Sequence, residues 1–184
     1  GRPLLVLFPG SRQQEVNRHL PIFIKVVSLI NNDNVQIIVG KVPQITLGEI
    51  PNNWKVEEDD TSLCLEYGTA VLTASGTATL QSAVQDIPAV VSYKMSSGSW
   101  LLAKNMSKVP FAAMTNLIAG KQIVPEFLQG DMTPENLANA IQPLLSNTAE
   151  RKEMLVGYEQ VRRTLGMPGV YERAADAILS RTFK

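Results

Sequence analysis

The sequence has 184 residues, balances 17 basic against 17 acidic side chains, and contains a single cysteine. This length suits one large domain, and balanced charge without blocks of one sign lacks the electropositive surface that nucleic-acid binding normally requires. Cys64 has neither a second thiol for a disulfide nor a histidine at ligand spacing for a zinc site. We therefore expect a buried thiol in a reducing compartment and no nucleic-acid partner.

The sequence also predicts where the protein works. No apolar run approaches the roughly 20 residues of a membrane-spanning helix, and the first residues do not form a signal peptide, which predicts a cytoplasmic protein. The chain starts at Gly1 without an initiator methionine and enters a strand-like run almost at once. Such a start is typical of a piece cut from a longer protein.

Short aliphatic runs alternate with amphipathic helical patterns up to residue 132. One helical face carries apolar residues from Ile22 to Ile30, and a second carries Leu80, Val84 and Ile87. Nearly continuous apolar strands separated by such helices indicate a parallel sheet covered on both sides. The sequence thus predicts an α/β, Rossmann-like doubly wound domain. The predicted strands are residues 3–8, 35–39, 54–57, 69–73 and 88–93.

Beyond residue 132 the strand-like runs stop. Thr133 followed by Pro134 marks a helix start, because proline suits the first helical position. Residues 133–184 therefore predict two or three closing helices, broken near residues 166–169, and the polar segment 41–53 predicts a flexible loop. Together these patterns indicate a single Rossmann-like domain over residues 1–184.

Two glycine-containing turns each follow a predicted strand and lead into a predicted helix. In the turn after residues 70–72, Ser75 suits a helix N-cap, Gly76 lets the backbone approach a ligand, and the first helical N–H groups favour an anion. Residues 9–12 form a second turn of this kind. Because ligands of doubly wound sheets lie at the carboxyl ends of the strands, the two turns predict two phosphate seats and hence a nucleoside diphosphate.

The first turn also has an ordinary structural interpretation. Ser11 and Gln14 would form a capping box, with Arg12 solvated. Glu15 would then be a surface acid, or a partner that holds Arg12 in place. We favour the phosphate seat, because an arginine beside a helix N-terminus at this sheet edge suits an anion. The sequence contains no convincing general base, and we expect His19 to be a surface histidine on a helical turn.

For the second turn the ordinary interpretation is that the small residues of segment 75–81 allow tight packing of a helix on the sheet. We favour ligand binding, since Thr77 and Gln81 are four residues apart and share a helical face. Both side chains can then reach one ligand. Asn116 is interpreted either as a turn or cap residue or as a ligand of the same substrate.

Five motifs stand in order along the chain: FPGSRQQEV at 8–16, ASGTATL at 74–80, PAVVSYKM at 88–95, NLIAG at 116–120 and IVPEFLQ at 123–129. In their order and intervals they resemble the carboxyl-terminal half of the lipid-A-disaccharide synthase family, over almost the whole chain. The resemblance implies the donor-binding half of a two-domain GT-B glycosyltransferase. Such an enzyme transfers diacylglucosamine from UDP-diacylglucosamine to diacylglucosamine 1-phosphate, inverts the anomeric centre and releases UDP.

The resemblance also implies roles for particular residues. Arg12 and the helix start at Gly76 would stabilise the departing diphosphate without a metal, Asn116 would orient the sugar or phosphate, and the missing amino-terminal domain would supply the base. Arg12 and Asn116 are thus the catalytic candidates, and neither a metal nor another cofactor is expected. The substrate-binding candidates are Gly10, Ser11, Arg12, Glu15, Ser75, Gly76, Thr77, Ala78, Thr79, Gln81 and Asn116.

The chain departs from the family pattern at two positions. Gln81 stands where the family usually has a glutamate, and in GT-B enzymes an acid there accepts hydrogen bonds from the ribose hydroxyls; Thr115 stands where proline is common. Two alternative functions therefore stay open. One is another UDP-N-acetylglucosamine enzyme of GT-B form, either a transferase or an epimerase, and the other is a non-catalytic nucleotide-sugar-binding module.

Residues 94–108 combine apolar bulk with three lysines. We favour a core-packing helix with solvated lysines, because one short helix binds a membrane weakly. Peripheral contact with the cytoplasmic face of the inner membrane stays open as a second hypothesis, since both implied substrates carry acyl chains.

Overall fold

The computed structural model describes residues 1–30, 34–74, 76–96, 110–166 and 169–182. At its centre is a six-stranded sheet in the order β3-β2-β1-β4-β5-β6, and every neighbouring pair is parallel. This order runs outward from β1 in one direction and from β4 in the other, so the predicted doubly wound α/β fold is confirmed. The strands are β1 (Leu4–Phe8), β2 (Gln36–Gly40), β3 (Lys55–Glu57), β4 (Ala70–Thr73), β5 (Ala89–Tyr93) and β6 (Glu126–Leu128).

All five predicted strands form, each within a residue of its expected bounds. The sixth, β6, was not predicted. It spans only Glu126–Leu128, follows Pro125, and pairs on one side with β5, where Phe127 lies opposite Ser92. Three residues are too few to show the alternation by which a strand is recognised in a sequence.

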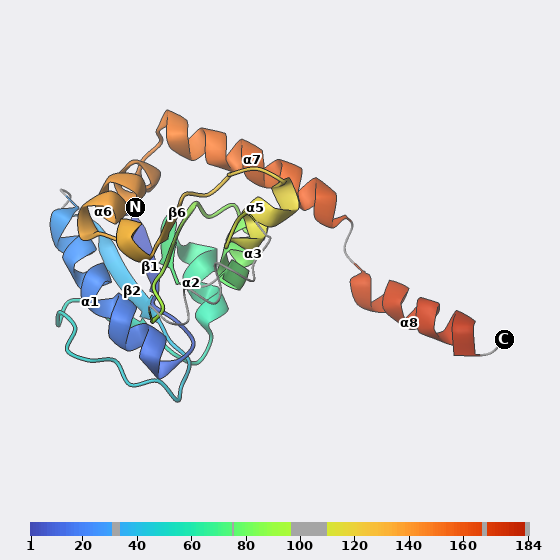
Figure 1. Ribbon diagram of the computed structural model, residues 1–184, viewed down its shortest axis with the longest axis horizontal. Coiled ribbons are helices and arrows are strands. Elements are labelled where there is room, and N and C mark those ends of the chain that lie inside the picture. The colour runs from blue at the N-terminus through green and yellow to red at the C-terminus, as the bar shows by residue number, and fades with distance from the viewer. Residues whose placement is uncertain (31–33, 75, 97–109, 167–168, 183–184) are drawn as a thin grey trace.

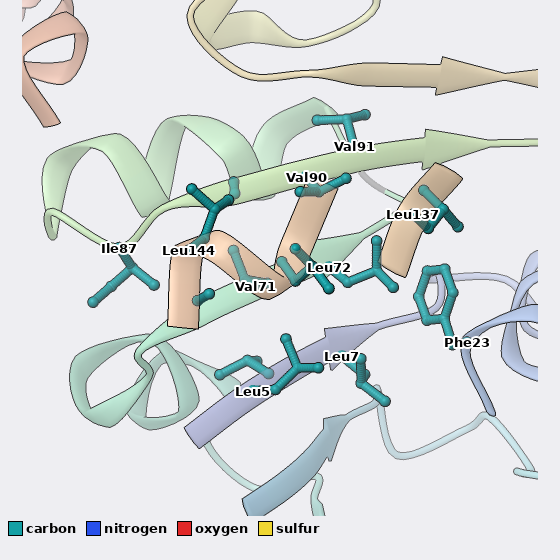
Figure 2. Close-up of a cluster of buried hydrophobic side chains, with 14 of the residues drawn as sticks. Leu5, Leu7, Phe23, Val71, Leu72, Ile87, Val90, Val91, Leu137 and Leu144 are labelled. Atoms are coloured by element: carbon teal, nitrogen blue, oxygen red, sulfur yellow. The ribbon is translucent and has the colours of Figure 1, made fainter. Parts of the chain in front are cut away.

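Helices cover both faces of the sheet. α1 packs against α6 over one face, while α3, α5 and α7 pack together over the other (Figure 1). Figure 2 shows Phe23 of α1 and Leu137 of α6 beside Leu7 and Leu72 of the central strands, all of them fully buried. The helices are α1 (Gln13–Leu29), α2 (Thr61–Tyr67), α3 (Gly76–Val84), α5 (Met114–Ala119), α6 (Pro134–Ile141), α7 (Ala149–Leu165) and α8 (Val170–Thr182), with 3-10 turns η1 (Gln129–Asp131) and η2 (Gln142–Leu145).

The predicted apolar face of α3 is confirmed only in part, because Leu80 packs partly buried against the core and Ile87, just after the helix, is buried. Val84 is 53% exposed, and the buried residues of the helix are small: Ala78, Thr79, Ser82 and Ala83. The hydroxyl of Thr79 donates to the Gly76 carbonyl at 2.6 Å and that of Ser82 to the Ala78 carbonyl at 2.8 Å. Because these hydroxyls find partners inside the helix, these residues can be buried without loss, and this face of α3 packs closely on the sheet.

The closing helices fulfil the prediction only in part. Thr133 caps α6 by accepting from the Asn136 N–H at 3.2 Å, and α6 and α7 complete the core. α8 instead extends from the body (Figure 1), and Tyr171 on it is 86% exposed. The break before α8 falls where predicted, and Gly166 and Gly169 there have φ angles of 83° and 92°, which favour glycine.

Two expectations from composition concern the thiol and the membrane. Cys64 is buried on α2 as predicted, and burial raises the pKa of its thiol to about 11, which makes it unreactive. Within the described ranges no helix is both long enough and apolar enough to cross a bilayer. Most of the lysine-containing stretch 94–108, for which a helix was expected, lies outside the described residues.

Candidate functional site

A cavity of about 260 Å³ opens at the carboxyl edge of the sheet, beside the point where the strand order reverses between β1 and β4. This is where ligands of doubly wound sheets bind. The structure brings the two predicted turns together here, because Gly10 and Ser11 from the first and Thr77, Ala78 and Gln81 from the second share its wall. The remaining lining residues are Phe8, Gly40, Lys41, Val42, Thr61 and Ser62.

The first turn is organised by Glu15. Gly10 has a φ angle of 140°, and a Cβ atom there would lie 2.4 Å from the Glu15 Cβ, so only glycine fits. The Glu15 carboxylate accepts hydrogen bonds from the Ser11 N–H at 3.0 Å and the Arg12 N–H at 3.3 Å. The helix therefore begins after Arg12 and is capped by Glu15, and the predicted capping box of Ser11 with Gln14 is wrong.

Glu15 is buried and also interacts with the side chains of Arg12 and Tyr93. Arg12 Nη1 lies 3.1 Å from Glu15 Oε1, and the Tyr93 hydroxyl donates to the same oxygen at 3.1 Å. Burial acts to raise the pKa of Glu15, but the hydrogen bonds from Ser11, Tyr93 and Arg12 outweigh it and the pKa is lowered. Glu15 is therefore an ionised internal partner of Arg12, which was one of the two predicted alternatives.

This arrangement changes the interpretation of the first phosphate seat. The N–H groups of Ser11 and Arg12 already donate hydrogen bonds to the Glu15 carboxylate, so they are not available to bind a phosphate. The turn therefore lines the cavity without providing an anion site. The Arg12 side chain is 78% exposed and borders a neighbouring hollow of about 440 Å³, together with Arg18, Tyr93 and Met95. Its guanidinium thus lies outside the cavity in which the sequence places the diphosphate.

The second turn leads into the start of α3 beside the cavity. The first turn of an α-helix leaves N–H groups without intrahelical acceptors, and at α3 this turn starts at Gly76 and Thr77 beside the cavity. Gln81 lies one turn further along the same wall. Thr79 was predicted to bind substrate, but it is fully buried with its hydroxyl bonded to the Gly76 carbonyl. Ser75 lies outside the described residues.

The wall opposite α3 was missed by sequence reasoning. It consists of Gly40, Lys41 and Val42 at the end of β2, with Thr61 and Ser62 at the start of α2. A Cβ atom on Gly40 would lie 2.2 Å from the Phe8 ring, so glycine allows β2 to end against Phe8. Lys41 is only 13% exposed and forms an ion pair with Glu58. Strand order could have revealed this wall. β2 lies next to β1 in the sheet, and its carboxyl end therefore borders the same cavity.

Asn116 does not border the cavity. Its side chain is fully buried, and its amide group donates to the Val124 carbonyl at 2.8 Å and to Glu126 Oε1 at 2.7 Å. Its oxygen accepts from the N–H groups of Ile123 at 2.7 Å and Val124 at 2.9 Å. The expectation that Asn116 contacts sugar or phosphate is corrected, because the hydrogen-bonding groups of this side chain are all bound to the protein.

His19 is likewise not the surface residue that was predicted. It is fully buried, its Nδ1 lies 2.8 Å from the Pro9 carbonyl, and its Nε2 accepts from the Lys94 N–H at 3.0 Å. Burial lowers the pKa of His19, and one donating and one accepting nitrogen describe the neutral ring. His19 therefore joins the first turn to the end of β5 and has no access to a substrate.

The fold resembles solved glycosyltransferases. CalG4, the calicheamicin glycosyltransferase, superposes with a TM-score of 0.64 at 17% identity, over 98% of this chain and 44% of CalG4. Glycosyltransferase VinC, solved in complex with dTDP, gives a TM-score of 0.59 at 16% identity, over 97% of this chain and 41% of VinC. At such identities the likeness concerns the fold alone: this chain has the fold of one part of a GT-B glycosyltransferase, less than half of each solved chain.

Sequence comparison is more specific. The chain is 34% identical to the lipid-A-disaccharide synthase of Myxococcus xanthus and 37% identical to that of Solibacter usitatus, each over 96% of its length. It spans about half of these relatives, 49% and 48% of their respective lengths. The family model described as lipid-A-disaccharide synthetase matches residues 1–179. With nearly all of its residues matched, the chain belongs to the lipid-A-disaccharide synthetase family.

Proposed function

We propose that this chain is the donor-binding half of a glycosyltransferase that moves diacylglucosamine from UDP-diacylglucosamine to diacylglucosamine 1-phosphate and releases UDP. The observation that carries the proposal is the cavity between the β1 turn and the start of α3, in a chain of this family. The diphosphate lies at the first turn of α3, where the helix offers N–H groups and a positive dipole end. The nucleoside extends past Gln81 toward the wall formed by Gly40, Lys41 and Val42.

Charge develops on the diphosphate as the glycosyl bond breaks, so groups at this position act mainly in the transition state. The N-terminus of α3 supplies part of the stabilisation in the proposed mechanism. Arg12 supplies the rest by exchanging Glu15 for a phosphate oxygen, since an exposed arginine keeps the rotamer freedom to do so and binds phosphate strongly. Neither interaction requires a metal, and we propose that none takes part.

Transfer also needs a base to deprotonate the acceptor hydroxyl. Glu15 is occupied by four donor groups and His19 is buried and neutral, so neither suits this role. We propose that the base and the acceptor site belong to the half of the relatives that this chain does not span. Because both substrates carry acyl chains, the complete enzyme is expected to work at the cytoplasmic face of the inner membrane.

Gln81 favours a second candidate, a nucleotide-sugar-binding module without catalytic activity. A neutral amide accepts hydrogen bonds from ribose hydroxyls less strongly than a carboxylate does. Another enzyme that uses UDP-N-acetylglucosamine stays a third possibility, because the same cavity suits any UDP-sugar.

One assay separates the three functions. The full-length protein is incubated with UDP-diacylglucosamine or with UDP-N-acetylglucosamine, with and without diacylglucosamine 1-phosphate, and UDP release and disaccharide formation are followed. Disaccharide formation that depends on the acylated donor supports the proposal. Conversion of the unacylated sugar nucleotide supports the other enzyme, and binding of UDP without any conversion supports the module.

A further inference from the structure

Residues 110–113, here termed the strap, lie against the start of α3. A Cβ atom on Gly76 would lie 2.9 Å from the Ala112 carbonyl oxygen and 3.9 Å from the Met114 nitrogen. The strap therefore packs backbone to backbone on the first residue of α3, with no side chain between to absorb a shift. Any displacement of Ala112 is transmitted to the helix start at the cavity.

A single carboxylate holds the strap. Glu126, at the start of β6, accepts a hydrogen bond from the Ala112 N–H at 2.8 Å through Oε2 and from the Ala113 N–H at 2.9 Å through Oε1. Two consecutive N–H groups on the two oxygens of one carboxylate fix both the position and the orientation of that backbone segment. Hydrogen bonds to an ionised acceptor are also stronger than those to a neutral one.

Asn116 fixes the carboxylate in turn. Its amide group donates to Glu126 Oε1 at 2.7 Å, while its oxygen is held by the N–H groups of Ile123 and Val124. The amide therefore cannot turn away without breaking these bonds. Asn116, which is fully buried, and Glu126, which is partly exposed, together connect the segment before β6 to the strap.

We infer that Glu126 is a positioning residue for the donor cavity, oriented by Asn116 and acting on the start of α3 through the strap. Neither side chain borders the cavity. The inference rests on the proposed function, because it assigns the effect to the α3 anion site.

The first test is Glu126→Gln in the full-length protein. The glutamine amide keeps the shape of the side chain, but its NH2 group replaces one of the two oxygens that accept from the strap. That NH2 group then faces an N–H donor of Ala112 or Ala113, and the repulsion shifts the strap. We expect affinity for UDP, measured by calorimetry, to fall by roughly two- to thirtyfold. Asp131→Asn is the matched control, since Asp131 borders the same surface hollow as Glu126 and losing its charge should leave the affinity unchanged.

The second test separates positioning from a loss of stability. In Asn116→Asp two acceptors face each other across the contact with Glu126, and UDP affinity should fall at least as far as in Glu126→Gln. In the variant that carries both substitutions, the new amide at position 126 donates to the new carboxylate at position 116, so affinity should recover relative to Asn116→Asp alone. If each substitution only lowered the stability of the fold, the double variant should bind UDP no better than Asn116→Asp alone, so a recovery of UDP affinity indicates a direct contact between the two side chains.

The outcomes separate this inference from the proposed function. If wild type binds UDP and Glu126→Gln binds it equally well, the positioning role is wrong and the proposed function stands. If the double variant binds UDP no better than Asn116→Asp, the link between the two side chains is wrong. If wild type itself does not bind UDP, the donor site and this inference are both overturned.

Discussion

The Tyr93 hydroxyl donates a hydrogen bond to Glu15 Oε1 across 78 positions of sequence, at 3.1 Å. Because Glu15 also holds the N–H groups of Ser11 and Arg12, this bond ties the β1 turn to the end of β5. Four residues further along α1, His19 makes a second tie between the same two segments. The turn beside the cavity is thus held both by local hydrogen bonds to Glu15 and by contacts with the end of β5, which lies two strands away from β1 in the sheet.

Tyr93→Phe should lower the free energy of unfolding by about 1.5 kcal/mol at neutral pH, since it removes one partly buried hydrogen bond to a charged group. The pKa of Glu15 in the folded state lies below its ordinary value of 4.5, so the stabilisation is present above that value and is lost as the pH falls through the folded pKa. Urea denaturation at pH 7 and at about pH 3 should therefore show a difference between variant and wild type that shrinks in acid.

The exposed Tyr67 on α2 provides the control for this prediction. Tyr67→Phe should change the free energy of unfolding little at either pH. A Tyr93→Phe effect of equal size at both pH values would show that the bond does not depend on the ionised carboxylate.

His19→Gln tests the second tie. The glutamine amide can still donate to the Pro9 carbonyl and accept from the Lys94 N–H, but it cannot be protonated. The pKa of His19 is lowered by burial from 6.5, so below that pH the unfolded chain binds a proton that the folded chain does not. Wild type should therefore lose stability as the pH falls from about 7 to 5.5, and the variant should lose less. Parallel stability curves for the two proteins would contradict the neutral, buried state of His19.

Arg12→Ala tests the leaving-group role. If Arg12 binds the departing diphosphate, kcat of the full-length protein should fall by about 10² to 10³ while affinity for the donor changes little, because the lost interaction strengthens in the transition state. Arg18→Ala is the control, since Arg18 borders the same hollow. A kcat within a few-fold of wild type for Arg12→Ala would restrict Arg12 to its contact with Glu15.

Gln81→Glu tests the ribose contact. A carboxylate accepts hydrogen bonds from the ribose hydroxyls more strongly than the amide, so UDP should bind a few-fold to about tenfold more tightly. Calorimetric titration with UDP and with 2′-deoxy-UDP provides the comparison. The gain should be smaller for the deoxy ligand, and an unchanged ratio of the two affinities would exclude a contact between residue 81 and the ribose.

Local patterns predicted the elements of this fold well. β1, β2, β4 and β5 formed where their aliphatic runs predicted, because a largely buried strand has a composition that few other segments share. β3 also formed where expected, although it is short and mostly exposed. The buried face of α3 was predicted only in part: Leu80 packs against the core as expected, but Val84 is 53% exposed. In fact close approach to the sheet selects Ala78, Ser82 and Ala83, and small size rather than hydrophobicity was the signal.

The sequence predicted those parts of the site that are formed by residues close together in the chain. Gly10, Ser11, Thr77, Ala78 and Gln81 belong to turns with recognisable chemistry, and they do meet in one cavity. The wall formed by Gly40, Lys41 and Val42, and the hydrogen bonds that join the β1 turn to the end of β5, depend instead on the order of the strands in the sheet. No pattern around position 19 reveals that its ring will meet the Lys94 backbone, 75 positions away.

The 184-residue chain by itself should fold, bind UDP weakly and catalyse nothing. It should fold because α1, α6 and α7 close the sheet without help from another domain. Under the proposed function, binding should be weak because the other wall of the cleft belongs to the half of the relatives that this chain does not span. Catalysis should fail because the acceptor site and the base are assigned to that same half. UDP should shift the backbone amide NMR signals of residues 76–81 and 40–42, while UDP release from the acylated donor stays at the rate without enzyme. Clear turnover by this chain would contradict the two-domain mechanism, and shifts confined to other segments would contradict the assigned cavity.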